Sequence, residues 1–105
     1  MSVIIINANN STVMTDAMVE AAQAAAPEIS FEGWTSHKGP RSIQGEADGA
    51  LAAPHPLQLV RRAEIAEAEG VNIGCFDDTA LVEASKLASC PVIGIGQAAY
   101  HYAAL

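Results

Sequence analysis

Four short segments of the chain have the apolar composition of β-strands. Val3 to Ile6 is an unbroken run of β-branched residues, which is typical of a strand that is buried on both faces. Val71 to Cys75 and Pro91 to Gly96 are mainly apolar segments of similar length. Ile29 to Thr35 alternates only weakly between apolar and polar residues, which predicts a more exposed strand. The sequence therefore predicts four strands.

Helical spacing is found in the segments between these strands. Apolar residues recur every three or four positions from Met14 to Ala25, and Pro27 ends this pattern. Three further helices are expected from Leu57 to Ala68 with Gly70 as the stop, from Thr79 as N-cap to Leu87, and from Gln97 onward.

One long segment has neither a strand pattern nor a full helix pattern. Residues 36–56 contain three glycines and three prolines, and we predict a loop with one helical turn around Gly45 to Leu51. Loops of this length are usually functional or mobile.

The alternation of strands and helices predicts an α/β domain over residues 1–105. Its fold class would be a doubly wound, mostly parallel four-stranded sheet with helices on both faces and strand order 2-1-3-4. Such sheets bind ligands beyond the carboxyl ends of the strands, at the point where the strand order reverses. Here that point lies between the first and third strands. The turns that follow these strands, Asn7 to Thr12 and Cys75 to Thr79, are also the most polar of the post-strand turns.

Cys75 is the candidate reactive residue because it stands at the end of a predicted buried strand, just before a helix. A helix N-terminus favours a thiolate, whereas the neighbouring Asp77 and Asp78 oppose it. The alternative is that the thiol is a small core residue, which is the commoner role of a free cysteine. We accept that role for Cys90, which precedes the fourth strand and should lie about 15 Å or more from Cys75.

The other polar residues near the predicted switch point have two possible roles. Asn7, Asn9 and Ser11 are either ligand-binding residues or turn and cap residues. Asp78 is expected to be only a helix-start residue. The Gly-Ile-Gly of residues 94–96 resembles a dinucleotide-binding motif only superficially. It lacks the third glycine and the downstream acidic residue of that motif. The three histidines have no metal-ligand spacing, so no metal site is predicted.

Charge and composition narrow the classes of partner. The formal net charge is −7 with only five Lys and Arg, which argues against nucleic acid or an anionic membrane as a partner. No apolar run approaches the roughly 20 residues of a membrane span, and the opening residues lack the basic region of a signal peptide. Two cysteines without metal spacing suit a reducing compartment, and we expect a cytoplasmic protein.

Four stretches, in order along the chain, resemble one protein family. They are residues 6–11 (Ile-Asn-Ala-Asn-Asn-Ser) followed by Met14 and Thr15, the loop residues 39–45 and 48–54, residues 74–78 (Gly-Cys-Phe-Asp-Asp), and residues 91–99. Together they resemble the aspartate/glutamate racemase superfamily, in particular its hydantoin and allantoin racemase branch. The sequence departs from the family pattern at Ala8 and Thr79, where the family has proline, at Asn10, where it has threonine, and at Gln97, where it has glutamate.

The resemblance implies a cofactor-independent racemase that acts on a small-molecule substrate, a hydantoin- or allantoin-like or amino-acid-derived carbon acid. Cys75 would be the catalytic residue, and the substrate-binding residues would be Asn7, Asn9, Ser11, Phe76 and Asp77. Family members are about twice as long and have a second catalytic cysteine in a second lobe, so this chain resembles the first lobe alone.

Because the chain resembles one lobe, its second base would come from another chain or lobe, and a homo-oligomer is expected. The alternative is a catalytically incomplete lobe that only binds a small ligand or a protein partner. The chain ends without a helix stop signal, as expected of a natural short form, a fragment or a truncation.

Overall fold

The central feature of the fold is one sheet of four parallel strands. The computed structural model describes residues 2–104, and the strands are β1 (Val3–Asn7), β2 (Phe31–Thr35), β3 (Gly70–Ile73) and β4 (Val92–Gly94). Their order across the sheet is β2-β1-β3-β4. The predicted strand order and α/β class are therefore confirmed.

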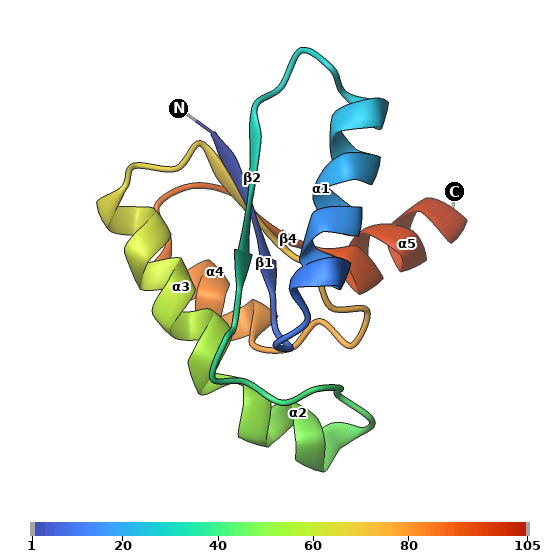
Figure 1. Cartoon of the computed structure of the whole chain (residues 1–105), viewed down its shortest axis with the longest axis vertical. Helices are drawn as coiled ribbons and strands as arrows, with labels where there is room; N and C mark the ends of the chain where they lie inside the picture. The colour runs from blue at the N-terminus through green and yellow to red at the C-terminus, as the bar shows by residue number, and fades with distance from the viewer. Residues whose placement is uncertain (1, 105) are drawn as a thin grey trace.

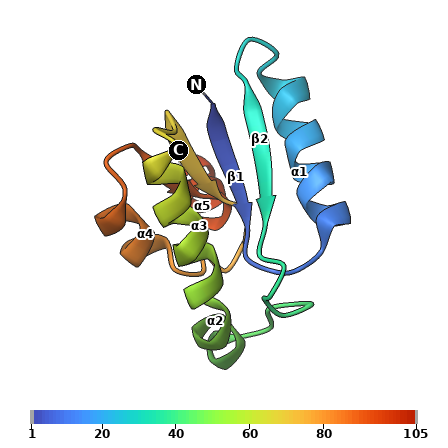
Figure 2. The same cartoon turned by 60° about the vertical axis from the view of Figure 1, so that its left-hand side comes forward.

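Helices cover both faces of this sheet (Figures 1 and 2). Helices α1 (Thr12–Ala25) and α5 (Ile95–Ala103) lie on one face, and α3 (Pro54–Ile65) and α4 (Leu81–Leu87) lie on the other. The short helix α2 (Glu46–Ala52) lies beyond the carboxyl ends of the strands, next to the start of α3.

The main core lies between the sheet and the α3/α4 layer. Ile4 and Ile6 point from β1 into this core, while Val3 and Ile5 line a hollow of about 270 Å³ on the α1/α5 face. The two faces of β1 are therefore both apolar, as the unbroken β-branched run predicts. The remaining buried members of the core are Leu59, Val60, Ala63, Val71, Ile73 and Ala84.

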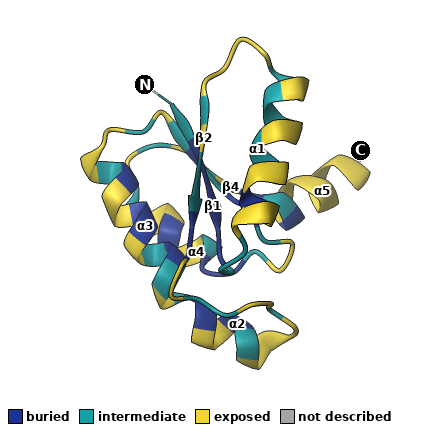
Figure 3. Cartoon of the chain, in the orientation of Figure 1, coloured by how far each residue is buried: buried dark blue, intermediate teal, exposed yellow. Residues whose placement is uncertain are grey.

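The burial pattern distinguishes the two helical layers (Figure 3). Helix α3 buries four of its residues, including Leu59 and Val60, whereas α5 buries only Gly96. The side chains of Tyr100 and Tyr102 on α5 are 66% and 79% exposed. The α1/α5 face is thus the less completely covered side of the sheet.

Several predicted boundaries were wrong by a few residues. Strand β3 ends at Ile73, so Cys75 lies beyond the strand and not within it. Helix α3 begins at Pro54, because proline at the first helical position loses no hydrogen bond that the helix needs. It ends at Ile65, and Gly70 begins β3 instead of stopping the helix. Among residues 2–104 the longest helix, α1, has 14 residues, and no helix is both long and apolar enough to cross a membrane.

Candidate functional site

The carboxyl ends of β1 and β3 bring two turns together, as the topology predicted. These strands pair in parallel with Ile6 opposite Ile73, and the ladder continues as the Gly74 amide donates to the Ile6 carbonyl at 2.8 Å. Cys75 follows directly, and its half-buried side chain lines a pocket of about 480 Å³. The two turns, α1, the loop before α2 and the start of α5 all line this pocket. Its lining residues are Asn9, Met14, Met18, Arg41, Ser42, Ile43, Gln44, Gly74, Cys75, Phe76, Asp77 and Ile95.

Asn7 organises the turn that follows β1. Its side chain is 1% exposed, and its Nδ2 donates to Asn9 Oδ1 at 2.9 Å, to the Ser11 carbonyl at 3.0 Å and to Thr15 Oγ1 at 3.1 Å. Its Oδ1 accepts from the Asn9 amide at 3.1 Å. The hydrogen-bonding capacity of Asn7 is therefore engaged within the protein.

Ser11 and Asn9 complete this turn in different ways. The Ser11 hydroxyl caps α1 by accepting from the Met14 amide at 3.2 Å. Asn9 Oδ1 accepts from the Ser11 amide at 2.9 Å, and Asn9 Nδ2 lies 3.6 Å from the sulfur of Met14. Of the three polar residues singled out from the sequence here, Asn9 lines the Cys75 pocket, whereas Asn7 and Ser11 build the turn behind it.

The turn that follows β3 has an unusual backbone. The Asp78 amide donates to the Cys75 carbonyl at 2.8 Å, and both Asp78 and Ala80 have left-handed backbone angles, with φ of 52° and 64°. Such angles are uncommon outside glycine. Because Ala80 is the N-cap of α4, the predicted N-cap role of Thr79 was wrong. Thr79 is instead 5% exposed, and its Oγ1 lies 3.4 Å from Cys75 Sγ.

Asp78 is more than a helix-start residue, which corrects the expectation from the sequence. Its Oδ1 accepts from the Gly96 amide at 3.0 Å, in the first turn of α5. A carboxylate is favourable at a helix N-terminus. A Cβ atom on Gly94 would overlap the Asp78 carboxylate, and one on Gly96 would overlap the Phe76 carbonyl. Glycine at positions 94 and 96 therefore leaves space for the Cys75 loop. This packing explains the Gly-Ile-Gly motif of residues 94–96, to which the sequence analysis assigned no role.

The loop before α2 contributes pocket residues that the sequence analysis missed. Arg41 and Gln44 line the pocket, and Arg41 is the basic residue among the lining side chains. The loop is held to the first turn by the Asn10 amide, which donates to the Pro40 carbonyl at 2.9 Å. The Gln44 amide donates to Asp48 Oδ2 at 3.0 Å. A loop has no periodicity from which this placement could be predicted, although the length of the loop indicated a functional or mobile segment.

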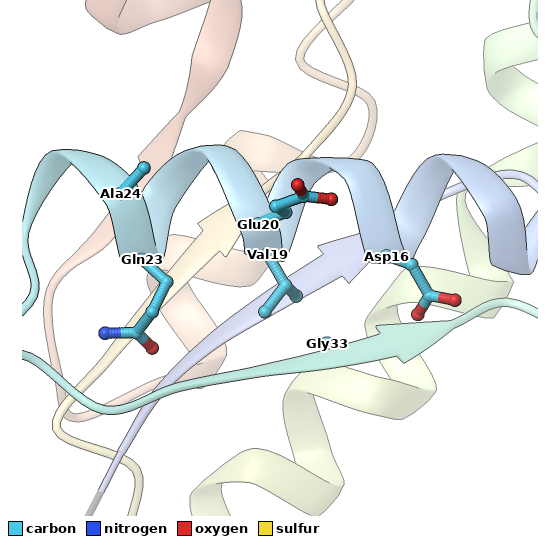
Figure 4. Close-up of a pocket in the computed structure, with 6 residues that line it drawn as sticks. All are labelled: Asp16, Val19, Glu20, Gln23, Ala24 and Gly33. Atoms are coloured by element: carbon cyan, nitrogen blue, oxygen red, sulfur yellow. The ribbon is translucent and has the colours of Figure 1, made fainter.

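A second, more open pocket lies between α1 and the edge strand β2 (Figure 4). It has a volume of about 600 Å³ and is lined by Asp16, Val19, Glu20, Gln23, Ala24 and Gly33. It shares no lining residue with the Cys75 pocket and has no thiol, imidazole or basic group among its lining residues. Of these two pockets, the Cys75 pocket is therefore the one that offers a thiol and a basic side chain.

Comparison with known proteins identifies the family. The Asp/Glu/hydantoin racemase family model matches residues 3–105. The chain belongs to this family.

Two similar proteins are hydantoin racemases, and a similar solved structure is an allantoin racemase. The chain is 34% identical over 103 residues to the hydantoin racemase of Paenarthrobacter aurescens, covering 96% of this chain and 44% of that protein. It is 37% identical over 106 residues to the hydantoin racemase of Rhizobium meliloti, covering 98% and 43%. The allantoin racemase from Klebsiella pneumoniae superposes with a TM-score of 0.88 at 37% identity, covering 99% of this chain and 43% of that one. The chain thus spans less than half the length of these racemases.

Cys90, the other cysteine of this racemase-family chain, occupies a different environment. It is half-buried and packs against the main core. Burial raises the pKa of the Cys90 thiol, and the nearby charge of Glu64 acts in the same direction.

We expect Gly96→Ala to lower the free energy of unfolding by about 1–3 kcal/mol, because the new methyl group would overlap the Phe76 carbonyl. Helix propensity alone would favour alanine by about 1 kcal/mol, so a loss must come from the overlap. Urea unfolding measures the effect. Gly70→Ala is the control, since its Cβ would lie 3.7 Å from the nearest atom, the Pro91 carbonyl oxygen, and should change stability by no more than about 0.5 kcal/mol. A Gly96→Ala protein as stable as the parent would contradict this packing.

We further expect iodoacetamide to alkylate Cys75 several-fold faster than Cys90 at neutral pH. Thiolate fraction and access both control this rate, and burial suppresses the thiolate of Cys90. Peptide mass spectrometry of partially labelled protein separates the two sites, with Cys75→Ser and Cys90→Ser as matched controls. Faster labelling of Cys90 would overturn the choice of Cys75 as the reactive thiol.

Proposed function

We propose that this chain provides one half of the active site of a cofactor-independent racemase that acts on a hydantoin- or allantoin-like carbon acid. The observation that supports it best is the Cys75 thiol in a pocket at the carboxyl ends of β1 and β3, in a chain of the racemase family. In this proposal the Cys75 thiolate removes the α-proton of the substrate, or its thiol returns one.

Racemisation requires a proton to leave one face of the carbon and another to arrive on the opposite face. A single fixed base hands its proton back to the face from which it came. Two bases on opposite faces, one thiolate and one thiol, exchange roles with the direction of the reaction. The α-carbanion of a hydantoin delocalises into the adjacent ring carbonyl, so the scheme needs only a group that stabilises the oxygen.

Groups for binding the ring and stabilising its oxygen are present around the pocket. The backbone amides of Asn9, Asn10 and Ser11 already donate within the protein, so these three amides are not free to bind a substrate oxygen. We assign oxygen stabilisation to the second turn at Phe76 and Asp77, with the Arg41 guanidinium adding positive charge.

Substrate recognition in this proposal is divided among the residues named from the sequence. The carboxylate of Asp77 would accept from ring N–H groups, the side-chain Nδ2 of Asn9 would donate to ring oxygens, and Phe76 would pack on the ring. Asn7 and Ser11 would act on the substrate indirectly, by holding the turn that presents Asn9.

The second base would come from another copy of the chain or from a separate lobe. Phe76, which lines the pocket, is 57% exposed and packs edge-on against Tyr100, with ring centroids 5.6 Å apart. Tyr102 on the same helix is also exposed. Exposed aromatic residues next to a pocket are typical of an interaction surface, which supports a homodimer that joins two Cys75 pockets.

Solvent deuterium exchange tests the function of Cys75. With a 5-substituted hydantoin as the probe, we expect Cys75→Ser to reduce the exchange of the α-proton by about 10²- to 10⁴-fold, the usual contribution of a general base. Cys90→Ser is the matched control and should leave exchange nearly intact. Optical rotation is followed in the same samples.

The combination of the two signals separates the alternatives. Exchange with loss of optical rotation indicates a complete two-base site. Exchange with retained rotation identifies a half-site, in which one base returns deuterium to the face from which it took the proton. If no exchange exceeds that of protein-free buffer, the racemase proposal is wrong and the incomplete, ligand-binding lobe is left as the alternative.

We expect the chain to be a homodimer or larger at high micromolar concentration, as measured by multi-angle light scattering. Tyr100→Lys should shift it toward monomer, because a charge would be buried at the proposed interface. Ile65→Lys is the control, since Ile65 is 83% exposed on α3, at the opposite face of the sheet. A monomeric parent protein would count against the shared-site dimer.

A further inference from the structure

The side chains of Cys75 and Thr79 form a contact that the proposed function does not yet use. Sγ of Cys75 lies 3.4 Å from Oγ1 of Thr79, within the range of a hydrogen bond to sulfur. In the part of the chain that the structure describes, this is the one hydrogen bond that either side chain makes. Thr79 is 5% exposed, so its hydroxyl has no ready access to water in place of the thiol.

Three features of the loop hold Thr79 in this position. Its two neighbours, Asp78 and Ala80, both have left-handed backbone angles, which are uncommon outside glycine and which alanine keeps only where the surrounding structure imposes them. The Asp78 carboxylate is fixed by the Gly96 amide, and the Asp78 amide by the Cys75 carbonyl. The chain between the two side chains is therefore constrained at both ends, and the hydroxyl points back at the sulfur.

The direction of this hydrogen bond depends on the charge of the sulfur. Either atom can donate while Cys75 is a thiol, but a thiolate has no proton, so the Thr79 hydroxyl must then donate. A hydrogen bond to a charged acceptor is stronger than one between neutral groups. The contact therefore favours the thiolate over the thiol.

The charged groups around Cys75 and Thr79 have opposite effects on the stability of the Cys75 thiolate. Arg41 and Asp77 line the pocket with Cys75, and Glu46, Asp78 and Glu83 line the hollow on the other side of Thr79. Carboxylates thus outnumber cations here, and they disfavour a thiolate. A hydroxyl that donates to the sulfur stabilises the thiolate without adding another charge.

We propose that Thr79 is a positioning residue for the Cys75 base, whose hydroxyl donates to the thiolate, fixes its direction into the pocket and increases its population. The inference rests on the proposed function, in which the Cys75 thiolate accepts the substrate proton. Thr79 does not touch the substrate in this arrangement and acts only through the sulfur.

The test compares Thr79→Val, which keeps the shape and removes the hydroxyl, with Thr79→Ser, which keeps the hydroxyl. Both are made in a Cys90→Ser background, and the rate of Cys75 alkylation by iodoacetamide is measured as a function of pH. Loss of a hydrogen bond to a charged group should reduce the thiolate population at a given pH about tenfold. The thiolate that remains should be about threefold more nucleophilic, because reactivity rises with basicity.

The expected result is a pair of crossing curves. Thr79→Val should react about threefold more slowly than the parent at neutral pH and about threefold faster on the alkaline plateau. Thr79→Ser should follow the parent within about twofold. A general loosening of the loop would speed alkylation at every pH and would not produce a crossing. Coincident curves for Thr79→Val and the parent, or a Thr79→Ser curve that follows Thr79→Val, would overturn the inference.

A measurement on the protein with Thr79 unchanged covers the case in which Thr79→Val does not fold. The ¹³C resonance of the Thr79 methyl group should titrate with the same midpoint as Cys75 alkylation, and this titration should disappear in Cys75→Ala. A methyl resonance that does not respond to pH in the thiol range would overturn the proposal. Neither measurement uses a substrate, so absence of hydantoin exchange would refute the racemase function alone, and unchanged alkylation profiles would refute the role of Thr79 alone.

Discussion

The parallel pairing of β1 with β3 is the constraint on which the rest of the site depends. The Val3 to Ile6 run is apolar on both faces and takes the centre of the sheet, and its partner places Ile73 opposite Ile6. Because the chain leaves both strands at the same edge, the Asn9 and Cys75 side chains open into one pocket, although 66 positions separate them in the sequence (75 − 9). Loss of this pairing would separate the two turns, whatever their own sequences.

A second constraint connects the Cys75 loop to the last helix. Asp78 binds the first turn of α5 through the Gly96 amide, and the glycines at 94 and 96 leave space for its carboxylate and for the Phe76 carbonyl. The side chain that the sequence suggested as a simple helix-start residue thus links β3, the thiol loop and α5. The same hydrogen bond holds the turn that carries Phe76 against α5, where the Phe76 ring contacts Tyr100.

Much of the fold followed from the sequence because its signals are local and periodic. The Val-Ile-Ile-Ile run, the spacing from Met14 to Ala25 and the polar turns gave the strand order and the place of the pocket. The role of Thr79 was missed because its side chain points back at Cys75 only when Asp78 and Ala80 take left-handed angles, and alanine gives no signal of such an angle. Arg41 was missed because its loop is positioned by a backbone contact with Asn10, which side-chain identity does not encode.

The two turns of the site differ in how they are stabilised. In the first, Asn7, Asn9 and Ser11 hydrogen-bond to one another and form a rigid support, and Asn9 keeps its side-chain Nδ2 beside the Met14 sulfur at the pocket. In the second, two non-glycine residues have left-handed angles, and within residues 2–104 the hydroxyl of the buried Thr79 is paired with a thiol alone. Strain of this kind persists where the surrounding structure overdetermines it, and it is concentrated at functional sites. In the proposed function, the turn after β1 therefore supports the pocket and presents Asn9, and the turn after β3 carries the reactive thiol.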